Sequence, residues 1–184
     1  MRLFYRDDEP DDCRLPHDTG KELPLTHLSN LGVLFYDFPI SDPSSIAKVD
    51  DLAKARNYAN RDEITVSPDA LGATYEENIK KFYDEHMHED EEIRYILEGT
   101  GYFDVRDVDD AWLRIEAKPG DLLILPAGIY HRFTVDEKNY IKATRLYQTL
   151  PKWASLNRSE ETEKNSYRKD YLRALAQVSP SSPS

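Results

Sequence analysis

The stretch FYDEHMHEDEEIRYILEGTGYFDVRD, residues 82–107, contains the pattern that decides the fold. Within it, His86-Met87-His88 is followed four positions later by Glu92. Residues two apart on a strand share one face, so the two imidazoles are predicted to lie side by side. After the intervening bend, Glu92 begins the next strand with its carboxylate directed the same way. Two imidazoles and one carboxylate suit Fe2+, Mn2+, Co2+, Ni2+ or Zn2+.

A second stretch, GDLLILPAGIYHRFTVDEKNY, covers residues 120–140 and supplies a fourth candidate ligand, His131. The preceding Pro126-Ala127-Gly128 turns the chain into a strand that begins at this histidine. Antiparallel pairing of strands would carry His131 opposite the first three side chains.

The acidic run around the first motif also has a simpler interpretation. Residues 84–92 contain six carboxylates, and such a run is usually a solvated face. However, three of the five histidines in the chain belong to the two motifs, and glycine turns occur at matching places in both. We therefore favour a metal site.

Short apolar or aromatic runs, separated by turn residues at close intervals, fill residues 91–148. This spacing is typical of a small β-barrel, and about six strands fit between the turns. Helical patterns flank it at residues 24–30, from residue 42, over 74–83 and over about 160–178. Thr74-Tyr75-Glu76-Glu77 fits a capping box for the third of these helices. We expect one domain over residues 1–178, followed by a disordered Ser/Pro tail at 179–184.

Composition narrows the classes of partner. The 184 residues include 24 Lys plus Arg and 35 Asp plus Glu, which gives a net charge of −11. This charge argues against binding to nucleic acid or to an anionic membrane surface. The N-terminus lacks the apolar core of a secretion signal, and the single cysteine, Cys13, has no partner for an internal disulfide. We expect a protein of a reducing compartment.

Alternation along the strands indicates which neighbours face the metal. Glu92, Arg94 and Ile96 share one face, so Arg94 is predicted to point toward the ion. An arginine there is either the partner of a surface carboxylate or a holder of an anionic substrate, and we favour the second role. Aromatic residues near the motifs are either core or the wall of an apolar pocket: Phe82, Phe103 and Phe133.

The two motifs, His86-x-His88-x3-Glu92-x6-Gly99 and Gly120-x5-Pro126-x-Gly128-x2-His131, resemble those of the cupin superfamily. The stretches at 82–107 and 120–140 resemble, more closely, the acireductone dioxygenase family in its eukaryotic form, and the likeness runs from about Met1 to Val178. It implies a mainly β cupin fold, a double-stranded β-helix or jelly-roll barrel with several flanking α-helices. Val135 stands where the broad cupin pattern usually has an asparagine, which is not a ligand.

The resemblance also implies roles for residues. One Fe2+ or Ni2+ per chain would be bound by His86, His88, Glu92 and His131, with Co2+, Mn2+ or Zn2+ as substitutes. Arg94 would contact the substrate in a pocket lined by the three phenylalanines. Two nearby carboxylates are candidates for a second shell or a general base: Asp90 and Glu91.

The family's substrate is 1,2-dihydroxy-5-(methylthio)pent-1-en-3-one, an acireductone of methionine salvage that reacts with O2. The iron form gives 4-methylthio-2-oxobutanoate and formate, and the nickel form gives 3-(methylthio)propanoate, formate and carbon monoxide. The resemblance further implies a cytoplasmic and also nuclear protein, and we expect a monomer.

Two alternatives stay open at this point. The chain could be another metal-dependent cupin, such as a sugar isomerase that uses zinc. It could also be a non-catalytic cupin that keeps a metal for structure, although Arg94 beside an open coordination position argues against a closed structural site.

Overall fold

The computed structural model describes residues 1–148 and 155–178, and the predicted tail at 179–184 lies outside them. Twelve strands lie in the described part: β1 Arg2–Arg6, β2 Asp18–Glu22, β3 Leu34–Asp37, β4 Asn60–Val66, β5 His86–Met87, β6 Glu92–Gly99, β7 Gly101–Arg106, β8 Trp112–Ala117, β9 Asp121–Leu125, β10 His131–Val135, β11 Ile141–Tyr147 and β12 Leu156–Asn157. The helices there are α1 Thr26–Asn30, α2 Ser45–Ala55, α3 Pro68–Leu71, α4 Tyr75–Tyr83 and α5 Ser166–Val178, with 3-10 turns at Gly72–Thr74 and Thr162–Lys164.

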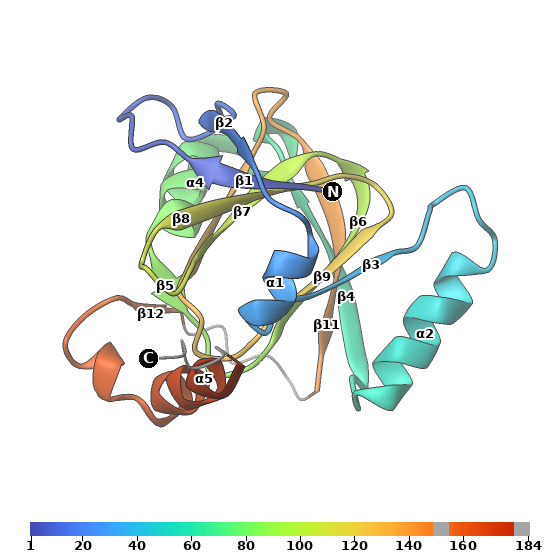
Figure 1. Ribbon diagram of the computed structural model, residues 1–184. Helices are drawn as coiled ribbons and strands as arrows, with labels where there is room; N and C mark the ends of the chain where they lie inside the picture. Colours follow the sequence, from blue (N-terminus) through green and yellow to red (C-terminus); the bar gives the residue numbers. More distant parts are fainter. Residues whose placement is uncertain (149–154, 179–184) are drawn as a thin grey trace.

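The strands form two antiparallel sheets that face each other around a common interior (Figure 1). Seven strands run in the order β12-β5-β10-β7-β8-β1-β2, and five run in the order β3-β9-β6-β11-β4. The mainly β architecture with flanking helices is thus confirmed, and six strands lie between residues 91 and 148, as predicted.

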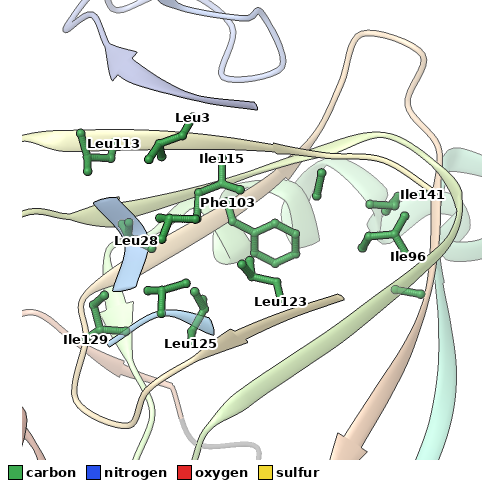
Figure 2. Packing of buried hydrophobic residues seen from close by; sticks show 14 of the residues in the cluster. Leu3, Leu28, Ile96, Phe103, Leu113, Ile115, Leu123, Leu125, Ile129 and Ile141 are labelled. Carbon is green, nitrogen blue, oxygen red and sulfur yellow. The ribbon is translucent and has the colours of Figure 1, made fainter. Parts of the chain in front are cut away.

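Strand β9 shows why the two layers hold together. All five of its residues are buried, because both of its faces are covered, which explains its unbroken apolar run. Leu123 and Leu125 face the interior, where they join the main cluster with Phe103 and Ile115 (Figure 2). The alternate side chains of β9, Leu122 and Ile124, face the other side of the sheet. There they form a second cluster with Val49 and Ala53 of helix α2.

The turn between β6 and β7 depends on Gly99. Its φ is +73°, and a Cβ there would lie 2.1 Å from the carbonyl oxygen of Tyr140. A side chain at Gly99 would therefore displace the backbone at the start of β11, where Ile141 pairs with Gly99, the last residue of β6. The predicted glycine turn is confirmed and has a steric reason.

The flanking elements differ from the predictions at their ends. Thr74 makes no capping hydrogen bond, because it ends a 3-10 turn and its hydroxyl donates to the carbonyl of Leu71. The last helix begins at Ser166 rather than near residue 160, since Thr162–Lys164 forms a 3-10 turn first. No helix in the described part of the chain is both long enough and apolar enough to cross a membrane.

Candidate metal centre

Three imidazoles converge where β5 meets β10. His131 is the first residue of β10, and its Cα pairs with that of His86 in β5, while His88 follows β5 directly. The ring centroids of these histidines are 4.5 to 5.2 Å apart. One ligand nitrogen from each histidine lies within 4.8 Å of the other two, which is a spacing that could hold a metal ion.

Backbone carbonyls fix the ring orientation of two histidines. Nδ1 of His86 lies 2.6 Å from the carbonyl oxygen of Asp84, and Nδ1 of His131 lies 3.0 Å from that of Ile129. A carbonyl only accepts, so Nδ1 carries the proton in both rings and Nε2 keeps its lone pair. Nε2 of His131 is buried and has no hydrogen-bond partner in the described part of the chain. A buried acceptor left in this way fits a metal ligand.

Glu92 supplies an ionised oxygen beside the imidazoles. Its Oε2 is 3.2 Å from Nε2 of His88 and 3.1 Å from Nη2 of Arg94. Burial alone would raise the pKa of Glu92, but the guanidinium of Arg94 and the imidazoles of His131 and His88 outweigh it and hold that pKa well below the usual range. Burial, together with His131, lowers the pKa of His86 to about 4. At neutral pH the imidazole of His86 is thus neutral and Glu92 is ionised, which suits ligands of a divalent transition metal.

The loop before His131 is held against helix α5. The amide of Gly128 donates to the carbonyl of His88, at 3.0 Å, which joins two of the histidine segments. Gly128 has a φ of +85°, and a Cβ there would lie 2.5 Å from the carbonyl oxygen of Tyr167 in α5. Nη1 of Arg168, also in α5, donates to the carbonyl of Gly128 at 3.1 Å. Only glycine allows this close approach of the helix to the ligand loop.

The imidazoles and Glu92 open into a cavity of about 290 Å³. Its wall includes Arg94, as the strand alternation predicts, and all three phenylalanines. Phe133 packs at 4.9 Å from Phe103 and at 6.2 Å from Phe82, measured between ring centroids. The remaining lining residues come mainly from β4, β6, β11 and α4: Ile64, Val66, Asn78, Lys81, Ile96, Ile141, Ala143, Arg145 and Ser155.

The structure does not bring the two second-shell candidates into this cavity. Asp90 is exposed. The carboxylate of Glu91 is bound instead by the guanidinium of Arg56 and the hydroxyl of Tyr58. Because Glu91 precedes Glu92 on the chain, the strand alternation turns its side chain to the opposite face.

A second guanidinium in the wall was missed from the sequence. Arg145 lies on β11 directly opposite Arg94 of β6. Its Nε and Nη2 donate to the two carboxylate oxygens of Asp62, at 2.8 and 2.7 Å. The sequence could have indicated this role of Arg145, because it alternates with Ile141 and Ala143 along β11 and all three residues face the cavity.

Comparison with known proteins identifies the relatives of this chain. The family model described as ARD/ARD' family matches residues 2–155. Curated relatives named acireductone dioxygenase include one from Aspergillus fumigatus, 53% identical over 175 residues, which covers 95% of this chain and 97% of the relative. Another, from Phaeosphaeria nodorum, is 56% identical over 173 residues, covering 94% and 96%.

A solved structure supports the same fold. It is described as acireductone dioxygenase from Bacillus anthracis with cadmium ion in active center, and it matches with a TM-score of 0.68 at 23% identity, over 84% of this chain and 96% of that chain. At this identity the match bears on the fold. The extent of the family model and the identity of the curated relatives go further, and the chain belongs to the ARD/ARD' family.

Proposed function

We propose that this chain is a metal-dependent acireductone dioxygenase of methionine salvage. The observation that carries the proposal is the position of the four candidate ligands: three imidazoles and one buried carboxylate meet at the wall of a cavity that also contains a guanidinium. The substrate would be 1,2-dihydroxy-5-(methylthio)pent-1-en-3-one, which carries adjacent oxygens suited to chelation, and the second substrate would be O2.

The ion would be held by His86, His88, Glu92 and His131. When bound, a divalent metal supplies Lewis acidity and, because four protein ligands leave two positions of an octahedron free, room for a bidentate substrate. We propose Fe2+ or Ni2+ as the resident ion, with Co2+, Mn2+ or Zn2+ as substitutes. The orphaned Nε2 of His131 supports a ligand role, since it otherwise leaves a buried acceptor without a partner in the described residues.

The chain's own side chains would bind and orient the substrate. Arg94 lies 3.1 Å from the Glu92 carboxylate and presents a fixed fork of donors to the cavity, which suits an enediolate with two oxygens. Arg145 adds a second guanidinium from the neighbouring strand, and it shares its charge with Asp62. The phenylalanine wall limits water around these charges, so their attraction for an anion is stronger than in bulk solvent.

The cavity offers little for removing a proton from the substrate. Of the described residues that line it, only Glu92 carries a carboxylate, and that group is assigned to the metal. A reductone loses protons easily, and two arginines favour its anion. We therefore propose that the substrate binds already ionised, and that Asp90 and Glu91 do not act as the general base.

We base the assignment of the reaction products on the resemblance to the acireductone dioxygenase family. Loaded with iron, the chain would yield 4-methylthio-2-oxobutanoate and formate, and loaded with nickel, 3-(methylthio)propanoate, formate and carbon monoxide. We also propose a single domain over residues 1–178 that acts as a monomer in the cytoplasm and the nucleus, without nucleic-acid or membrane partners. Size-exclusion chromatography and cell fractionation test these last assignments.

The decisive experiment is oxygen uptake by metal-loaded protein with the acireductone, together with identification of the products. Oxygen consumption with formate release supports the proposal. Isomerisation of a sugar without oxygen uptake would favour the other cupin enzyme, and tightly held metal without turnover of either substrate would favour the non-catalytic cupin.

A further inference from the structure

The cavity wall formed by β4, β6 and β11 is arranged in three rows across the sheet. The first row contains Arg94 and Arg145, which face each other. In the second row Ala143 of β11 lies between Ile96 of β6 and Ile64 of β4. Ile141 and Val66 form the third row: these two residues are also direct partners. The wall therefore changes from charged, with each arginine ion-paired to a carboxylate, to apolar along the strands.

A break in the strand register keeps the far end of this wall apolar. Lys142 pairs with Glu98, but the next residue, Ala143, pairs with Ile96, so β6 carries one extra residue at this point. Simple alternation after Glu92, Arg94 and Ile96 would direct Glu98 into the cavity. Instead Glu98 is exposed, and its carboxylate accepts a hydrogen bond from the hydroxyl of Tyr140 at 2.7 Å.

Ala143 is the smallest side chain in these rows. It lies on β11, between β6 and the edge strand β4, with an isoleucine on each side, a position where a β-branched residue would fit the strand better. It is 4% exposed and lines the cavity, so its small size leaves space inside the protein rather than at the surface.

We propose that Ala143 is a specificity-determining residue whose small side chain leaves room for the apolar tail of the substrate. The inference rests on the proposed function, which places the oxygen-bearing head of the acireductone at Arg94 and the metal ligands. Successive rows are about 7 Å apart along an antiparallel strand. An extended tail of four heavy atoms spans about 5 to 6 Å, so it reaches from the first row to the second.

The test compares two acireductones that share the head and differ in the tail. One carries the methylthio tail, and the other, 1,2-dihydroxypent-1-en-3-one, has only two tail carbons. Dissociation constants are measured without oxygen, by calorimetry on metal-loaded protein, and KM is measured separately by oxygen uptake. Ala143→Val narrows the second row and is expected to reduce the preference for the longer tail by roughly 10- to 200-fold, the range for one misfitted methylene-sized group.

A control variant tests whether added bulk by itself changes the preference. Ala117→Val adds the same bulk to a buried strand alanine of the main cluster that does not line the cavity, and it is expected to leave the preference unchanged.

The outcomes separate the two proposals. Oxygen consumption by the wild type with both substrates, together with an unchanged tail preference in Ala143→Val, overturns the role of Ala143 alone. A wild-type protein that binds and turns over neither acireductone overturns the proposed function as well. A shift in tail preference in Ala143→Val, absent in Ala117→Val, supports the inference.

Discussion

Replacing Arg94 with lysine is expected to impair turnover far more than metal content. The guanidinium is held in place by Glu92 at 3.1 Å and by the carbonyl of Ile93 at 3.0 Å, and it has no lone pair for an ion. Lysine keeps the positive charge that holds Glu92 ionised, so metal binding should survive. It offers one compact charge in place of a two-pronged donor. Loss of one charge-assisted hydrogen bond, worth about 1.5 to 3 kcal/mol, would lower kcat/KM by roughly 10- to 150-fold.

The assay is steady-state oxygen uptake on wild type and variant matched for metal content by mass spectrometry. Arg61→Lys is a matched control, because Arg61 lies on β4 with its side chain 46% exposed and paired to Asp50 outside the cavity. The control should lie within about twofold of wild type, as expected for an exposed ion pair. Equal kcat/KM values for Arg94→Lys and wild type would refute this role. Arg94 would then be only a structural ion-pair partner of Glu92.

Four further outcomes are expected. Replacing His86, His88 and His131 together with alanine should abolish tight metal binding while circular dichroism keeps its β signature; one retained equivalent of metal would place the site elsewhere. Exchanging iron for nickel in the same polypeptide should switch the product from the keto acid to carbon monoxide, and identical products from both loaded forms would contradict this. Glu91→Gln should change oxygen uptake by less than about threefold, whereas a loss near 100-fold would make Glu91 the general base. Leu123→Ala should cost about 2 to 5 kcal/mol of unfolding free energy in urea, since that side chain is 1% exposed in the main cluster; a cost below about 1 kcal/mol would mean that the cluster closes around the gap.

The elements that could be predicted from the sequence are those whose signals are local. His86, His88 and Glu92 lie within seven residues: the strand period places the two histidines on one side, and a short bend brings Glu92 to them. Turn residues mark the strands from β6 to β11 in the same way: Gly99, Gly120 and Gly128 in three of the turns, and acidic and polar residues at 107–110 and 136–139 in the other two. Strand β2, by contrast, is exposed along its whole length and carries no apolar alternation, so only its pairing with β1 defines it.

The environment of Glu91 shows the limit of such reasoning. Nearness to Glu92 in the sequence made it a candidate base, but the residues that bind it, Arg56 and Tyr58, follow helix α2 and lie more than 30 positions earlier. An ion pair of this kind depends on how the helix packs over the outer face of the sheet. Sequence spacing carries no information about that packing, since the contact joins segments that are remote along the chain.

The metal ligands depend on local sequence patterns, whereas the selectivity of the cavity depends on contacts between segments that are remote along the chain. The candidate ligands and Arg94 come from two compact motifs, so a metal site can be predicted from their spacing, while the reaction is inferred from the resemblance of those motifs to a known family. The wall that would select the substrate tail comes from β4 and β11, which pair with each other across more than 70 residues of sequence. Ala143 is an ordinary strand residue until strand pairing places it between Ile64 and Ile96, one row beyond two arginines. Under this proposal a change at Ala143 would alter which tail fits, while the metal motifs stayed the same.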